Sequence, residues 1–134
     1  MITVSTSIHA SLEKIWDFWT NSKHITHWNF AGDDWHCPKA ENDLQVGGKF
    51  NYRMEAKDGS MDFDFEAIYT NVIEFQSIEY KMDDNRKVVI SFEKLENSIL
   101  ITEKFDAENE NPIEMQQQGW QMILDNFKKY VERN

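Results

Sequence analysis

The sequence is poor in several residue types that define whole classes of protein. It has a single cysteine, Cys37, so neither a disulfide framework nor a zinc site built from cysteines is available. Only 2 of its 134 residues are proline and 5 are glycine, and no linker rich in Pro, Gly or Ser divides the chain. We therefore expect one domain over residues 1–134, in a reducing compartment.

Long hydrophobic runs and an excess of positive charge are also missing. The N-terminus lacks the features of a signal peptide, and no stretch approaches the roughly 18 to 20 apolar residues that a membrane span needs. Asp and Glu total 24 against 14 Lys and Arg, which gives a formal charge of −10. Because nucleic acids and anionic membranes attract clustered cations, we expect neither as a partner. From the single cysteine and the lack of a signal peptide or a membrane span, we expect no membrane insertion and a cytoplasmic location.

Aromatic residues, by contrast, are abundant. The chain has 5 Trp, 4 Tyr and 9 Phe, which together make 13% of its residues. Such rings either fill the core of a short chain or line an internal pocket. Composition leaves both interpretations open.

The hydrophobic periodicity predicts mostly short strands. A strand over 2–9 is followed by a helix that Ser11 caps and by a second short helix that ends near His27. Residues 28–44 have no clean period and predict a long irregular connection. Alternation with a period of two then predicts an antiparallel meander of strands over 49–56, 62–69, 76–82, 87–95 and 98–105.

A long C-terminal helix is the clearest predicted element. Asn111 is its expected N-cap, with Pro112 in the first helical position and Glu114 three residues after the cap. One apolar stripe follows, formed by Ile113, Trp120, Ile123, Leu124, Phe127 and Val131. These elements predict an α+β fold in which the last helix packs on a curved antiparallel sheet.

Several motifs resemble those of a known family in order and spacing. They are IWDFWT at 15–20, HW at 27–28, DLQVGGKF at 43–50, KDG at 57–59, FEAIY at 65–69, and GW followed by LDNF within 119–127. The chain resembles the helix-grip fold of the START and Bet v 1-like (SRPBCC) superfamily. Within that superfamily, it resembles the family named after the C-terminal domain of the heat-shock-protein-90 ATPase activator.

This resemblance implies a curved antiparallel sheet of about seven strands wrapped around the long helix, with two short helices after the first strand. It also implies an elongated cavity between the sheet and that helix. Members of the superfamily bind lipids, sterols, polyketides and other apolar molecules there, and a few act as cyclases, dehydratases or hydrolases. The named activator stimulates a chaperone, but it does so with an additional N-terminal domain that we do not expect here.

The aromatic strands are the first candidate site. We expect their inward rings to face the long helix, where Gly119 lacks a side chain and Met115 lies one turn earlier. Ordinary core packing is the alternative. The candidate ligand-binding residues are Trp28, Trp35, His36, Phe50, Tyr52, Met54, Phe63, Phe65, Tyr69, Met115, Gly119, Trp120 and Ile123.

The loop over 28–37 is the second candidate. Trp28 and Trp35 make it more apolar than a solvated loop needs to be, so it is either a lid over the cavity or a plug in one end of the barrel. Tyr52, Tyr69 and His36 would orient a ligand through their polar tips.

The sequence offers no complete set of metal ligands and no motif for a catalytic nucleophile. His24 and His27 stand three residues apart and His36 adjoins Cys37, but a zinc site needs three or four rigid ligands, so we expect no metal and no cofactor. No nucleophile elbow, P-loop, dinucleotide fingerprint or H-E-x-x-H motif is present, and we assign no catalytic residue. Glu66 and Glu103 lie on predicted strands, and the sequence does not show which face of the sheet either side chain occupies. A carboxyl on the inner face would be buried, would have a raised pKa and could serve as an acid or base.

Three hypotheses follow, in order of preference. The first is a module that binds a hydrophobic or amphipathic small molecule. The second is a cyclase- or hydrolase-type enzyme, which needs an ionisable group in the same cavity with a partner within hydrogen-bond reach. The third is a co-chaperone that stimulates a heat-shock-protein-90 ATPase. The identity of the ligand and the oligomeric state are not predicted.

Overall fold

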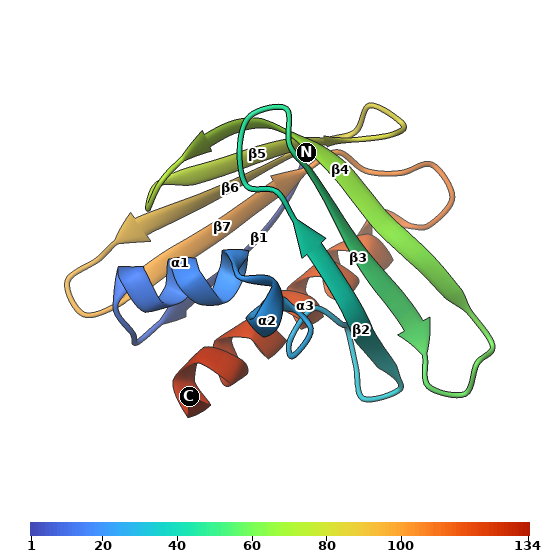
Figure 1. Ribbon diagram of the computed structural model, residues 1–134, viewed down its shortest axis with the longest axis horizontal. Coiled ribbons are helices and arrows are strands. Elements are labelled where there is room, and N and C mark those ends of the chain that lie inside the picture. Colours follow the sequence, from blue (N-terminus) through green and yellow to red (C-terminus); the bar gives the residue numbers. More distant parts are fainter.

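The computed structural model describes residues 1–134 and shows one antiparallel sheet that arches over three helices (Figure 1). The helices are α1 (Leu12–Thr20), α2 (Ser22–Ile25) and α3 (Ile113–Arg133). The strands are β1 (Ile2–Ile8), β2 (Trp35–Asn42), β3 (Lys49–Ala56), β4 (Asp62–Ile73), β5 (Ser77–Met82), β6 (Lys87–Lys94) and β7 (Ile99–Phe105). The predicted α+β helix-grip architecture is confirmed.

The strand order is β1-β7-β6-β5-β4-β3-β2, so β1 and β2 form the two edges of the sheet. The chain leaves β1, forms α1 and α2, and enters the sheet again at the opposite edge. It then runs as a meander from β2 to β7, which closes against β1 with Val4 opposite Glu103. Because α1 and α2 join the two edges, they lie under the arch of the sheet (Figure 1).

The predicted N-cap of α1 is correct, and that of α3 is wrong by one residue. The Ser11 hydroxyl accepts a hydrogen bond from the backbone N–H of Lys14 at 3.2 Å. At α3 the N-cap is Pro112, which makes no side-chain capping bond. The side-chain amide nitrogen of Asn111 donates instead to the carboxylate of Glu108 in the preceding loop.

The expectation of an irregular connection over 28–44 is wrong for residues 35–42, which form the edge strand β2. This strand pairs with β3, but its register shifts between His36 and Lys39. Pro38 lies within that shift, where its missing N–H costs no ladder hydrogen bond. The shift breaks the alternation of side chains, which hides the strand from a search for a period of two.

The core is densest around the second half of α3. Trp19 of α1 and Trp28 of the following loop both pack edge-on against Phe127, with ring centroids 4.8 and 4.7 Å away. The largest fully buried side chains are Phe105, Phe127, Ile8, Ile15, Ile25, Ile90, Ile101, Leu124, Val88 and Val131. All ten come from β1, β6, β7, the short helices and the C-terminal half of α3.

The first half of α3 is attached in a different way. The buried residues of this helix are Leu124, Phe127 and Val131, and none of residues 113–123 is buried. The side-chain amides of Gln117 and Gln121 donate to the backbone carbonyls of Thr3 and Ser5, at 3.2 and 3.1 Å. These bonds hold the helix beside the edge strand β1 and leave space between its first half and the middle of the sheet.

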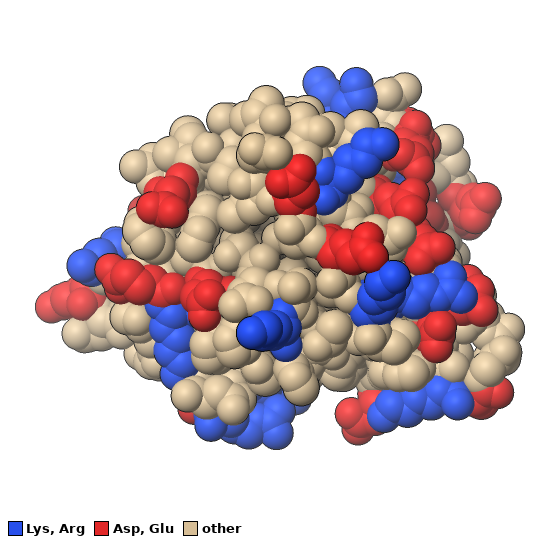
Figure 2. All heavy atoms as spheres, viewed as in Figure 1, with Lys and Arg blue, Asp and Glu red and all other residues tan.

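The surface carries charges of both signs. On the face shown in Figure 2, Lys and Arg are interspersed with Asp and Glu, and no continuous basic patch is visible. None of the helices is long and apolar enough to cross a membrane.

The unequal packing of α3 makes the first prediction. Leu124→Ala removes a side chain that is 0% exposed and should lower the free energy of unfolding by about 2–5 kcal/mol, because it leaves a cavity in the dense half of the core. Met122→Ala, on the same helix but 50% exposed, should change it by less than about 0.5 kcal/mol. Urea denaturation measures both values. Equal losses would contradict this division of the helix.

Candidate ligand-binding cavity

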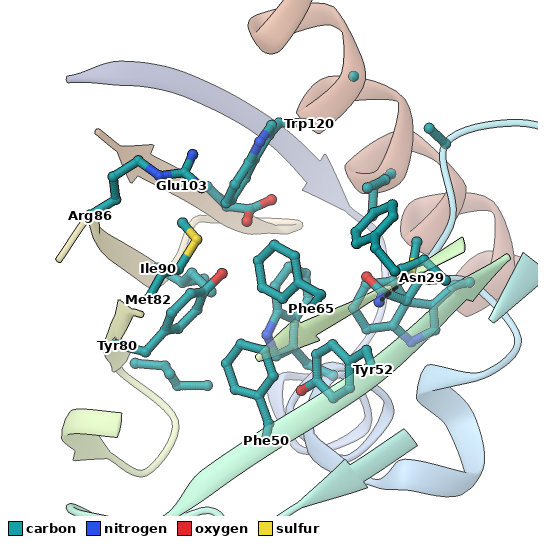
Figure 3. Close-up of a pocket in the computed structure, with 18 of the residues that line it drawn as sticks. Asn29, Phe50, Tyr52, Phe65, Tyr80, Met82, Arg86, Ile90, Glu103 and Trp120 are labelled. Carbon is teal, nitrogen blue, oxygen red and sulfur yellow. Dashed lines mark hydrogen bonds between the residues drawn. The ribbon is translucent and has the colours of Figure 1, made fainter. Parts of the chain in front are cut away.

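A cavity of about 340 Å³ lies between the first half of α3 and the sheet (Figure 3). It is lined by 20 residues, of which 15 are hydrophobic. The lining comes from β3 to β7, from α3, from Trp19 of α1, and from the loop after α2. Residues from both ends of the chain therefore form one apolar space.

Ten of the thirteen candidate residues line this cavity. They are Trp28, Phe50, Tyr52, Met54, Phe63, Phe65, Tyr69, Gly119, Trp120 and Ile123. The strand residues among them meet because β3 and β4 pair in register, with Tyr52 opposite Phe65 and Met54 opposite Phe63. That these residues contact a ligand remains a prediction.

Trp35, His36 and Met115 do not line the cavity. His36 pairs with Glu55 across the β2–β3 ladder, and its Nε2 lies 3.4 Å from the Glu55 carboxylate, on the outer face of the sheet. The Trp35 ring packs edge-on against Phe63 with centroids 5.8 Å apart. Met115 precedes Gly119 by one turn and is 57% exposed. The expectation that His36 orients a ligand inside the cavity is therefore wrong, because this residue faces outward.

Trp28 acts as a plug and not as a lid. It is buried, its indole Nε1 donates to the backbone carbonyl of Phe18 at 3.0 Å, and its own carbonyl accepts from the side chain of Asn126 at 2.9 Å. These bonds attach the start of the loop to α1 and α3. Trp28 therefore closes one end of the cavity, beside Asn29 and Ala31, which also line it.

Ten lining residues were not among the candidates. They are Trp19, Asn29, Ala31, Ile78, Tyr80, Met82, Arg86, Ile90, Glu103 and Glu108. The alternation of Ile78, Tyr80 and Met82 marks the inner face of β5 and was a usable signal. In the same way, Glu103 lies in phase with its buried neighbours Ile101 and Phe105.

Three tyrosines bring hydroxyl groups to the cavity. The hydroxyl of Tyr69 donates to the Asn42 side-chain oxygen at 2.5 Å, and the Asn42 amide donates to the carbonyl of Thr20 at 2.7 Å. Burial raises the pKa of Tyr69 to about 12 and the pKa values of Tyr52 and Tyr80 well above their usual range. All three are therefore neutral hydroxyls at physiological pH, and the single proton of Tyr69 is already donated to Asn42.

Glu103 is the one buried charged residue of the protein. It is 5% exposed, stands between Val4 of β1 and Ile90 of β6, and points into the cavity (Figure 3). Its carboxyl group makes no hydrogen bond or ion pair with another residue, and burial alone raises its pKa to about 8. Glu66, the other carboxyl weighed from the sequence, is exposed and accepts from Asn51 at 2.7 Å.

The other charged residues of the lining already have partners within the chain. The Arg86 Nε donates to the Asp84 carboxylate at 2.6 Å, and the Glu108 carboxylate accepts from Asn111. No group of three or more His, Cys, Asp or Glu side chains is placed to hold a metal ion. Cys37 is buried behind the lining residues Asn29 and Tyr52, and burial raises the pKa of its thiol, so it is a poor nucleophile.

The buried carboxyl of Glu103 makes a prediction about pH. Its folded-state pKa is raised from 4.5 to about 8, so the folded state holds this proton where the unfolded state releases it. The contribution of this proton to the free energy of unfolding is complete below about pH 4.5, where both states hold it. The contribution is lost as the pH rises through 8, and the loss is roughly 1.4 kcal/mol for each pKa unit of difference.

Glu103→Gln should remove this loss and be more stable than the native protein at pH 9, as measured by urea denaturation across the pH range. Glu93→Gln is the matched control, because Glu93 is an exposed strand carboxyl, and it should keep the native pH dependence. A native-like decline in Glu103→Gln would contradict the assignment.

Comparisons with known proteins agree with the fold. The sequence model of the family described as activator of Hsp90 ATPase homolog 1-like protein matches residues 9–132. The solution structure of an AHSA1-like protein from Aeromonas hydrophila is 40% identical, with a TM-score of 0.90 over 98% of this chain and 93% of that chain. A solution structure from Cytophaga hutchinsonii is 47% identical, with a TM-score of 0.86 over 99% and 92%.

More distant relatives share the fold alone. A crystal structure from Chromobacterium violaceum is 20% identical, with a TM-score of 0.87 over 99% of this chain and 98% of that chain. No curated protein matches the sequence. From the family match and the two structures above 30% identity, the chain belongs to the activator of Hsp90 ATPase homolog 1-like family, within the START and Bet v 1-like superfamily.

Proposed function

We propose that the protein binds a hydrophobic or amphipathic small molecule in the cavity between α3 and the sheet. The observation that carries this proposal is the unfilled space of about 340 Å³, with 15 hydrophobic residues among the 20 that line it. Pockets for small molecules commonly measure about 300–1,000 Å³ and are lined mainly by apolar and aromatic side chains with a few polar groups. The three tyrosine hydroxyls and Glu103 are those polar groups here.

Gly119 supports the same proposal. A Cβ atom added at this position would meet nothing within 4 Å, so close packing of the helix on the sheet does not require glycine there. Glycine in the interior of a helix costs about 1 kcal/mol relative to alanine. Keeping the side chain short preserves the volume of the cavity, which is a functional reason to accept that cost.

An enzyme that uses the same cavity is the second candidate, and Glu103 is the observation that favours it. This carboxyl has a pKa close to the physiological range and faces the cavity, as a general acid or base must. It lacks a hydrogen-bonded partner from this chain, however, so a second reacting group would have to come from the substrate. We therefore prefer the binding module.

Two further expectations from the sequence stay proposals. A cytoplasmic location rests on the single, buried and unpaired Cys37. Stimulation of an Hsp90 ATPase rests on the name of the family. Neither is needed for binding in the cavity.

The proposal is tested by filling the cavity from α3. Gly119→Leu should weaken the binding of decanol by at least about tenfold, because its side chain enters the space that the alkyl chain would occupy. The variant should remain folded, since leucine is a better helix former than glycine. Titration followed by tryptophan fluorescence measures the affinity, because Trp19, Trp28 and Trp120 line the cavity.

Gln118→Leu is the matched control. It adds the same side chain to the same helix at an exposed position and should bind decanol as the native protein does. If the native protein binds no decanol, or if Gly119→Leu binds it as tightly as the control, the cavity is not the binding site.

A further inference from the structure

The Glu103 side chain is the one buried carboxyl group of the protein, and it has no partner within the chain. Its neighbours across the sheet are Val4 and Ile90, and neither offers a polar side-chain atom. The carboxyl forms no capping bond, no ion pair and no network, in contrast to Tyr69, whose hydroxyl is fixed by Asn42. No fully buried side-chain oxygen of the protein lacks a partner, so the unbonded Glu103 oxygens are accessible from the cavity, where a group from outside the chain can bind them.

We propose that the ligand is an amphiphile with a protonated amine, and that Glu103 binds this amine while the apolar part fills the rest of the cavity. The inference rests on the proposed function and names the chemical class of ligand for that same site. A carboxylate accepts hydrogen bonds from an ammonium group and neutralises its charge, which satisfies both groups at once.

The surrounding charges favour a cation over an anion. Arg86 is the only cationic side chain in the lining, and its guanidinium is already held by Asp84 at 2.6 Å. An anionic ligand in the cavity would bring its charge close to the carboxyl group of Glu103. The protein carries a formal charge of −10, which attracts cationic ligands and repels anionic ones at long range.

Aromatic rings of the lining add to this preference. Burial raises the pKa of the Tyr80 hydroxyl most, and the nearby Glu103 carboxylate raises it further, which places this ring on β5 close to Glu103. Phe65 and Trp120 also line the cavity, with ring centroids 6.2 Å apart. The faces of such rings attract an ammonium group by cation–π interaction, most strongly where water is excluded. Figure 3 shows Glu103, Tyr80, Phe65 and Trp120 around this part of the cavity.

The proposal predicts a characteristic dependence of affinity on pH. Because the free protein holds the Glu103 proton up to a pKa of about 8, binding of an ammonium group at lower pH must expel that proton. The affinity should therefore fall by up to about tenfold for each pH unit from 8 down to 6.

The other groups that face Glu103 do not produce this trend. The lining side chains of β3, β4 and β5 contribute only the hydroxyls of Tyr52, Tyr69 and Tyr80, whose pKa values are raised and which stay neutral in this range. Val4 of β1, Ile90 of β6 and Trp120 of α3 do not titrate. Arg86 from the β5–β6 loop stays charged, and the Glu108 carboxylate, in the loop before α3, accepts a hydrogen bond from Asn111.

The test compares three probes with the same alkyl chain: decylamine, decanol and decanoate. Their affinities are measured by calorimetry at pH 6, 7 and 8 with the native protein, with Glu103→Gln and with the outer-face control Glu93→Gln. Decylamine should bind the native protein at pH 8 about ten- to a hundredfold more tightly than decanol does, and decanoate should bind most weakly. Glu103→Gln should lose the preference for decylamine and its pH dependence, and should still bind decanol.

The outcomes separate this inference from the proposed function. If decanol and decylamine bind the native protein equally, or if Glu103→Gln keeps the amine preference, the cavity binds amphiphiles but Glu103 does not select an amine. A preference for decanoate would overturn the inference in favour of an anionic ligand. If none of the three probes binds, the proposed function itself fails, and the inference fails with it.

Discussion

The hydrogen bonds from Gln117 and Gln121 to the carbonyls of β1, with the stacking of Trp120 on Phe105 at 3.9 Å between ring centroids, hold the first half of α3 along β1 and β7, and the interior of the protein depends on that position. β1 is an edge strand, so its outer carbonyls need partners, and the helix supplies two of them. The second half of α3 then packs densely through Phe127 and its neighbours. The first half is held at the edge and cannot fill the space under β3 and β4, and the cavity is the result.

The buried carboxyl of Glu103 lowers the stability of the fold and gives the cavity a polar group that can bind a ligand. A carboxyl between Val4 and Ile90 opposes folding whenever it is ionised, and a residue such as glutamine or leucine would suit the strand better. Natural proteins accept such local conflicts where a site requires them. Gly119 is a second and smaller case, because alanine would stabilise the helix without meeting another atom. Both residues face the same space.

Regular alternation made most of the fold and much of the lining predictable from the sequence. The strands that carry Phe50, Tyr52 and Phe65 show a clear period of two, and their inward rings lie where that period places them. The edge strand β2 was missed because the register shift around Pro38 breaks the pattern. His36 was misplaced for the same reason, since its facing depends on that shift.

The polar part of the site was harder to predict. Glu103 shares the inward phase of its strand, but a charged residue on an apolar face is more often a surface residue at the end of a strand than a buried one. Which side of α3 is left open depends on contacts between residues more than 100 positions apart, such as Gln121 with Ser5, and no local pattern encodes them. The volume of the cavity follows from those contacts.

A crystal structure of the protein grown with decylamine tests most directly whether the space beneath the first half of α3 accepts a ligand whose polar end meets Glu103. We expect an alkyl chain between α3 and the strands β3 and β4, with its nitrogen within hydrogen-bond distance of the Glu103 carboxylate. A structure in which the first half of α3 closes onto the sheet and side chains fill the space would contradict this expectation.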